Sequence, residues 1–204
     1  MYSTKITKEQ ITSSSKYLQG GIHDDVVLTS VKMDKSPSGN NFLEVTFSKD
    51  ASIVTHTEWE PKKFPNQDDD SFQERQSNQL GRLLQILSCY YDSKLFDDYE
   101  CNTFTELAMF VKDKLQDVVD NKVVNIPVRL KVVYNSKGYT TLPNYSKYTF
   151  IEPMSVEKST IEKVAKDLFE RPIQADKEPS VDPLAKTVDT VTETPTSNLN
   201  GLPF

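Results

Sequence analysis

The sequence predicts a mainly β fold, a barrel of about five antiparallel strands with two helices inserted between the third and fourth strands. Three observations predict it. Short β-branched segments bounded by turn residues occupy 26–59 and recur over 126–151. Between them, over 72–118, apolar residues recur with a helical period. After residue 172 the chain is polar and rich in proline, which is typical of a segment that does not fold by itself.

The first three strands are predicted at 26–33, 42–47 and 52–59. The first is rich in β-branched residues, and the turn residues Ser-Pro-Ser-Gly-Asn-Asn follow it at 36–41. The second alternates apolar and polar residues, so one of its faces should be buried. We therefore expect the first two strands to form a hairpin and the third to end before Pro61, since proline breaks a regular strand.

Two helices are predicted next, the first over roughly 72–91. Its apolar stripe is formed by Leu80, Leu83, Leu84 and Leu87. The acidic and hydroxyl residues at 68–71 suit either a metal or a helix cap, and the cap is favoured because such side chains satisfy the free N–H groups of a first turn. The second helix begins at Thr103, where Glu106 three residues later matches a capping box.

Strands resume at 126–134. One face of this segment carries Val128, Leu130, Val132 and Tyr134, and the other carries Arg129, Lys131 and Val133. A tight turn at 135–138 leads to a partner strand at 139–142, and a last strand at 148–151 completes the sheet. Residues 155–171 contain enough apolar residues for one short amphipathic helix.

This order of elements is that of the OB-fold, a five-stranded Greek-key barrel whose open face commonly binds oligonucleotides. An antiparallel sheet with helices on one side and a distorted sandwich are the alternatives. We expect a flexible arm at 1–20, the OB-fold-like domain at 21–154, the short helix at 155–171, and a disordered acidic tail with an apolar tip at 172–204. The hydrophobic content of 36% fits a folded body with a solvated tail.

Composition and motifs argue against several classes of protein. No run approaches the apolar length of a membrane span, and the first residues lack the apolar core of a signal peptide, so we expect a cytoplasmic protein without membrane contact. Cys89 and Cys101 are too few and too far apart for a zinc site or a redox pair, so we expect reduced thiols and neither metal nor cofactor.

A catalytic function is not expected either. His23 and His56 have no Cys, Ser or acid at a recognisable nucleophile spacing, and no Gly-rich phosphate loop is present. A two-metal nuclease using the acid pairs at 24–25 or 97–98 is a weaker alternative, because adjacent side chains on a strand point to opposite faces. The sequence therefore predicts a protein that is not an enzyme.

Single-stranded nucleic acid binds to basic grooves lined by flat aromatic rings, and the segment 129–148 interleaves both kinds of residue. The net charge of -6 argues against uniform attraction to nucleic acid but permits a local basic groove. The alternative is that these are core aromatics and solubilising lysines of an ordinary sheet. The candidate nucleic-acid-binding residues are Lys32, Lys35, Phe42, Trp59, Lys62, Lys63, Arg129, Lys131, Lys137, Tyr139, Tyr145 and Lys147.

Three segments carry a resemblance to a known family: Ile-His-Asp-Asp-Val-Val-Leu at 22–28, Gly-Asn-Asn-Phe-Leu-Glu-Val-Thr-Phe at 39–47, and Lys-Val-Val-Tyr-Asn-Ser-Lys-Gly-Tyr at 131–139. Together with Phe-Ile-Glu at 150–152 they resemble the OB-fold single-stranded DNA-binding proteins of tailed-bacteriophage replication modules, over roughly 20–153. The resemblance implies single-stranded DNA as the ligand, coated and protected in the host cytoplasm during replication, recombination or repair.

The C-terminal Leu202, Pro203 and Phe204 are similar to the apolar tip that ends the acidic tail of bacterial single-stranded DNA-binding proteins. That resemblance implies recruitment of replication or recombination proteins. Here Ser-Asn-Leu-Asn at 197–200 precedes the tip in place of an acidic run, so capture would depend on the apolar side chains and the terminal carboxylate. The alternative is a structural or adaptor protein of a phage particle that docks other proteins through its β-domain and tail. The oligomeric state is left open.

Overall fold

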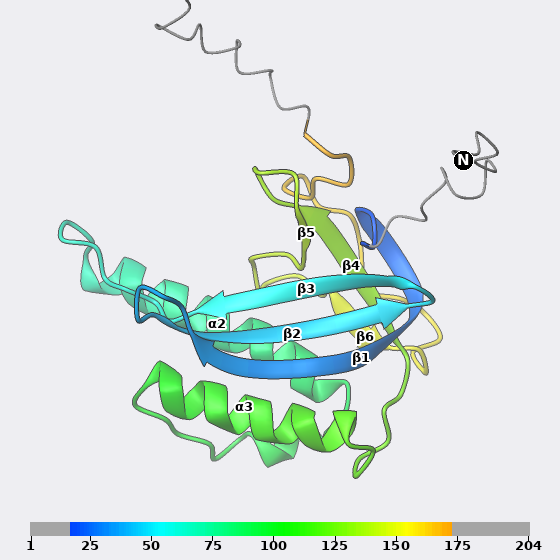
Figure 1. Ribbon diagram of the computed structural model, residues 1–204, viewed down its shortest axis with the longest axis horizontal. Helices are drawn as coiled ribbons and strands as arrows, with labels where there is room; N and C mark the ends of the chain where they lie inside the picture. Colours follow the sequence, from blue (N-terminus) through cyan, green and yellow to red (C-terminus); the bar gives the residue numbers. More distant parts are fainter. Residues whose placement is uncertain (1–16, 173–204) are drawn as a thin grey trace, which may run out of the picture. The chain divides into compact units, whose positions relative to one another are not determined.

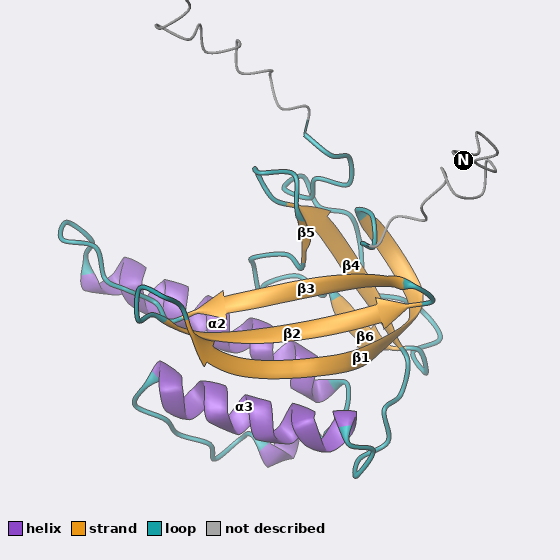
Figure 2. Ribbon diagram, in the orientation of Figure 1, coloured by secondary structure: helices purple, strands orange, loops and turns teal. Residues whose placement is uncertain are grey.

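The computed structural model describes residues 17–172, and the elements in this range follow the predicted order. The strands are β1 (Gly21–Lys35), β2 (Asn41–Lys49), β3 (Ser52–Trp59), β4 (Val128–Tyr134), β5 (Thr140–Thr141) and β6 (Ile151–Pro153). The helices are α2 (Asp69–Ser88) and α3 (Phe104–Val119), with a turn of 3-10 helix, η1 (Ser93–Leu95), between them. Both long helices lie between β3 and β4, as predicted (Figures 1 and 2). The predictions for the first sixteen residues and for the tail and its tip lie outside the described range.

The strands form an antiparallel sheet in the order β3-β2-β1-β4-β5, and β6 pairs with β4. The long strand β1 serves two neighbours: 21–26 pairs with β4, and 27–35 pairs with β2. Each ladder contains an irregularity, and Asp25 adopts a left-handed conformation with φ of 57° in the first of them. The edge strands β3 and β5 contact each other, with His56 Nδ1 lying 3.1 Å from Thr141 Oγ1. The mainly antiparallel β architecture with two helices is thereby confirmed.

The core lies between the sheet and the helices. The alternation predicted for the second strand is confirmed, because Leu43, Val45 and Phe47 are fully buried. Helix α3 packs against β1 and β2, and α2 packs against α3 and β6 (Figure 1). The buried stripe of α2 is rotated from the predicted one: it contains Gln79, Leu83, Ile86 and Leu87, whereas Leu80 is 37% exposed. Within residues 17–172, no helix has the length and apolar content that crossing a membrane requires.

Both helix starts are capped by the residues that the sequence indicates. The Asp68 carboxylate accepts a hydrogen bond from the Ser71 amide at 2.7 Å, so the acids before α2 act as a cap. Thr103 Oγ1 accepts from the Glu106 amide at 3.2 Å, and the Glu106 carboxylate accepts from the Asn102 amide at 2.9 Å. This reciprocal arrangement is close to a capping box.

The short helix predicted at 155–171 is wrong, because this segment is irregular in the structure. It lies over β4 instead: the Tyr134 amide donates to the Leu168 carbonyl at 2.8 Å, and Ile161 is buried. Lys131 of β4 donates to the Glu162 carbonyl, and the Val164 amide donates to the Asp167 carboxylate at 2.9 Å. A helix would satisfy these backbone groups internally, whereas here the β4 backbone and the Lys131 and Asp167 side chains satisfy them.

Candidate nucleic-acid interface

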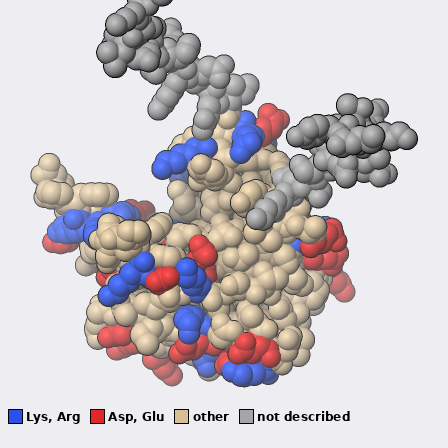
Figure 3. Space-filling model, in the orientation of Figure 1, with Lys and Arg blue, Asp and Glu red and all other residues tan. Residues whose placement is uncertain are grey.

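The candidate interface is the face of β1, β2 and β3 that points away from the core. Alternation places Phe42, Glu44 and Thr46 of β2 on this face, beside Thr55 and Trp59 of β3. This face is turned toward the viewer in Figures 1 and 3. Figure 3 shows that its middle is largely free of charged residues, which gather toward its margins. This face therefore presents aromatic rings and hydroxyl groups to a ligand.

One end of this face carries an aromatic corner, formed by Lys32, Phe42 and Trp59 from three adjacent strands. Trp59 is 49% exposed, and its ring centroid lies 5.0 Å from that of Phe42 at an interplanar angle of 46°. Lys32 Nζ lies 5.6 Å from the Phe42 ring centroid. Lys32 also pairs with Asp34 at 3.1 Å, but both side chains are about half exposed, so this pair is weak and easily exchanged.

The remaining basic residues predicted near this corner lie on the strand end and on the connection to α2. Lys35 is exposed at the end of β1, and Lys62 and Lys63 are exposed after β3. Lys63 forms an ion pair with Asp69. The structure adds Phe64, which is 61% exposed with the Arg75 guanidinium 5.0 Å from its ring centroid. No local pattern marks this pair, because the two residues meet only when the connection folds back onto α2.

The other end of the face borders a cavity of about 310 Å³, which we call the tyrosine cavity. Its walls include Tyr17, Thr55, Tyr134, Tyr139 and Arg171. Tyr139 was predicted as a binding residue and is 65% exposed, and Lys137 is exposed at the tip of the same hairpin. Tyr17 and Arg171 were missed, since one lies in the expected arm and the other in the expected helix.

The predicted phosphate contacts Arg129 and Lys131 are not on the open face. Lys131 is 0% exposed and pairs with Asp167 at 3.0 Å. Arg129 is held between Asp24 at 2.6 Å and Glu152 at 2.7 Å, and its bonds to these two carboxylates raise its pKa. The reason is that residues 155–171 cover the second face of β4. The alternation of apolar and polar residues in this strand had predicted that this face is exposed. Both side chains are therefore occupied by protein carboxylates.

Tyr145 is also occupied within the protein. Its hydroxyl donates to Asp167 at 2.7 Å and accepts from Lys131 at 2.9 Å. Burial and the neighbouring Asp167 carboxylate raise the pKa of this hydroxyl. Lys147, by contrast, is exposed, with its Nζ 5.8 Å from the Tyr148 ring centroid. Lys147 therefore presents its charged end to solvent, unlike Arg129 and Lys131.

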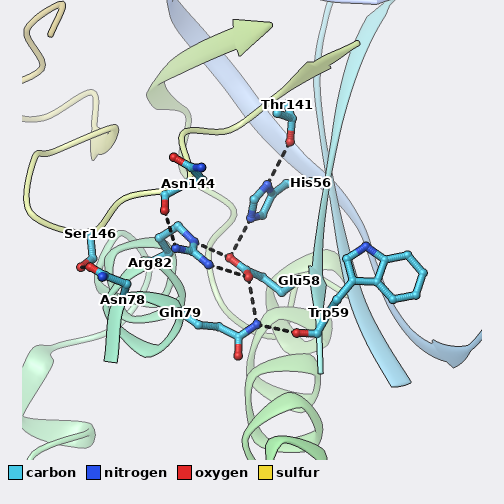
Figure 4. Close-up of polar contacts among 9 residues, drawn as sticks. All are labelled: His56, Glu58, Trp59, Asn78, Gln79, Arg82, Thr141, Asn144 and Ser146. Atoms are coloured by element: carbon cyan, nitrogen blue, oxygen red, sulfur yellow. Dashed lines mark hydrogen bonds and ion pairs between the residues drawn. The ribbon is translucent and has the colours of Figure 1, made fainter. Parts of the chain in front are cut away.

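A buried polar cluster fixes the strand that carries Trp59 (Figure 4). The Arg82 guanidinium donates to both Glu58 oxygens, at 2.6 and 2.8 Å, and His56 Nε2 lies 2.9 Å from the same carboxylate. Gln79 donates to Glu58 at 3.0 Å and to the Trp59 carbonyl at 2.9 Å. Burial opposes the charge of Glu58, but the bonds from Arg82 and His56 prevail and lower its pKa to about 2.

The geometry offers no candidate for metal chemistry in the described part of the chain, where no three His, Cys, Asp or Glu side chains lie close enough to hold an ion. Asp24 of the predicted acid pair is bound to Arg129. Comparison with protein families, with curated protein sequences and with solved structures finds no match to this chain.

Proposed function

We propose that this chain is a non-enzymatic single-stranded DNA-binding protein that coats and protects DNA during replication, recombination or repair. The observation that carries the proposal is the outward face of β1–β3, where the aromatic corner and the tyrosine cavity lie at opposite ends of one strand face. Exposed aromatic rings on a sheet give stacking platforms for unpaired bases, and lysines at the margin neutralise phosphates. DNA as the nucleic acid follows from the resemblance of the 22–28, 39–47 and 131–139 segments.

The sheet supports this proposal by its topology. The pairing of β1 with both β2 and β4, the contact between β3 and β5, and the helices after β3 are all features of an OB-fold. We propose that the sheet forms an OB-like barrel that closes between β3 and β5. We also propose that the protein acts in the cytoplasm. In this reading α3 covers the core side and leaves the outward face to the ligand.

The test is a titration of the protein with labelled oligo-dT, followed by fluorescence anisotropy at two salt concentrations. Trp59→Ala should weaken binding by about 5- to 150-fold, since a stacked base contributes roughly 1–3 kcal/mol. Glu44→Gln should tighten binding, most at low salt, because it removes a negative charge from the outward face beside the aromatic corner. Tyr148→Ala is the matched control, since this exposed tyrosine lies outside the face.

Absence of salt-sensitive binding by the wild-type protein would refute the proposal and favour a structural or adaptor protein. Equal affinities of Trp59→Ala and Tyr148→Ala would move the site away from the aromatic corner. The tip at 202–204 is proposed to recruit replication or recombination proteins. Deleting 174–204 should leave DNA affinity unchanged or tighter, and a loss of affinity would mean that the deleted residues bind DNA.

A further inference from the structure

The tyrosine cavity has the volume and the lining chemistry of a site for one small aromatic ligand. Its volume of about 310 Å³ lies at the small end of the range for ligand sites. Three tyrosines contribute to its walls: Tyr17, Tyr134 and Tyr139. Among the described residues that line the cavity, Arg171 is the only one with a full charge, so this lining favours a ligand that is both aromatic and anionic.

The walls are fixed before any ligand arrives. The Tyr134 hydroxyl donates to the Gln19 side-chain oxygen, which joins β4 to the segment before β1. The Asn135 side chain accepts from the Lys137 amide at 2.9 Å and from the Tyr139 amide at 3.1 Å, which fixes the hairpin turn that carries Tyr139. A site held in this way loses little conformational entropy on binding.

Arg171 is positioned by one bond that leaves the rest of its guanidinium available. Its Nε donates to the Gly138 carbonyl at 3.0 Å. Gly138 has φ of 77°, a left-handed conformation that favours glycine, so this residue allows the turn that presents its carbonyl to Arg171. Among the described residues no hydrogen bond to the two terminal nitrogens of Arg171 is formed. Those nitrogens match the bidentate geometry of a phosphate.

We propose that the tyrosine cavity is a base-binding subsite, in which one unpaired nucleobase stacks against Tyr139 while Arg171 binds the adjacent phosphate. The proposal rests on the proposed function and adds the position of a second stacking site. Thr55 lines the cavity and lies four residues before Trp59 on the same strand face, so the cavity and the aromatic corner are separated by about 13 Å along β3. One bound strand therefore contacts both ends.

The experiment compares affinities for the shortest oligo-dT that saturates the full-length protein, by anisotropy. Tyr139→Ala should weaken binding about 5- to 150-fold, and Tyr139→Phe should restore it, because stacking needs the ring and not the hydroxyl. Arg171→Gln should lower the slope of log affinity against log salt by about 0.7, the value for one phosphate on a single strand. Tyr148→Ala and Lys112→Gln are the matched controls on other surfaces.

An abasic scan then tests whether one base enters the cavity. In the wild-type protein, a single abasic nucleotide should weaken binding most at two positions of the oligomer. Tyr139→Ala should abolish the penalty at one of them and Trp59→Ala the penalty at the other. Both penalties persisting in Tyr139→Ala would overturn the subsite.

The two proposals fail in different ways. If Tyr139→Ala and Arg171→Gln bind like the controls while Trp59→Ala binds weakly, the subsite is refuted and the proposed function stands. If the wild-type protein itself does not bind oligo-dT, the proposed function fails and the subsite fails with it. Circular dichroism of each variant shows whether a loss reflects unfolding.

Discussion

Lys131 and Asp167 form a buried ion pair, and replacing Lys131 with methionine should destabilise the protein strongly. Both side chains are almost completely buried, and Nζ lies 3.0 Å from the carboxylate. Lys131 also donates to the Tyr145 hydroxyl and to the Glu162 carbonyl. The substitution keeps the apolar stem but removes the positive charge that balances the buried Asp167 carboxylate, which then keeps only its hydrogen bonds from the Tyr145 hydroxyl and the Val164 amide.

The expected loss is about 3–5 kcal/mol of unfolding free energy, the usual cost of removing one partner from a buried pair. This is a large share of the roughly 5–15 kcal/mol that a domain possesses. Lys131→Met combined with Asp167→Asn removes both charges while the asparagine oxygen still accepts a hydrogen bond. The double variant should therefore be more stable than either single variant.

Urea unfolding measures these differences. Far-ultraviolet circular dichroism is the better probe, because the fluorescence of Trp59 would report on the candidate interface and not on the fold as a whole. A loss below about 1 kcal/mol for Lys131→Met would contradict the buried pair. If the double variant loses as much unfolding free energy as the two single variants together, the buried pair is contradicted as well, because the effects of independent residues add. Lys112→Met, at an exposed pair on α3, is the matched control and should change stability little.

Three further predictions concern other parts of the fold. The Glu58 pKa of about 2, against an ordinary 4.5, should add about 3 kcal/mol of stability. This contribution is fully present above pH 4.5 and is lost as the pH falls toward 2. Urea unfolding across this range should show the loss, and Glu58→Gln should make the free energy of unfolding less dependent on pH. Thr103→Ala should cost about 1 kcal/mol in thermal unfolding while Thr103→Ser costs little, and equal losses would rule out the hydroxyl as the cap. Burial and the Glu152 charge raise the pKa of the Cys89 thiol to about 12. A thiol reagent should therefore modify the less buried Cys101 first and Cys89 only on unfolding. Simultaneous modification of both thiols in the native protein would contradict the burial of Cys89.

The sequence predicts the parts of this fold that local pattern determines. The three-residue spacing from Thr103 to Glu106 gave the start of α3, and the alternation through Leu43 and Phe47 gave the buried face of β2. It also placed Phe42 and Trp59 among the binding residues, and the structure brings their rings together. The capping and alternation predictions are confirmed because neighbouring residues along the chain decide them, whereas the binding role of Phe42 and Trp59 stays a prediction.

The errors come from contacts between residues far apart in the sequence. Alternation in β4 places Lys131 on the opposite face from Leu130 and Val132. The burial of the Lys131 side chain, however, depends on Asp167, which follows 36 residues later. The same covering segment carries Arg171 to the tyrosine cavity, where Tyr17 arrives from before β1. A helical pattern at 155–171 gave no indication of this path, because polar contacts with Lys131 and the Tyr134 amide hold the segment on β4, and Ile161 is its only buried apolar residue.

The dual pairing of β1 also limits how this gene can change. Because β1 aligns with β4 over 21–26 and with β2 over 27–35, one inserted or deleted codon in its middle would exchange the inward and outward side chains of one half relative to the other. The turn at 36–40, which joins β1 to β2 outside both ladders, can absorb such a change without altering either register. Length variants of this protein are therefore expected to survive at the turn and to be lost from β1.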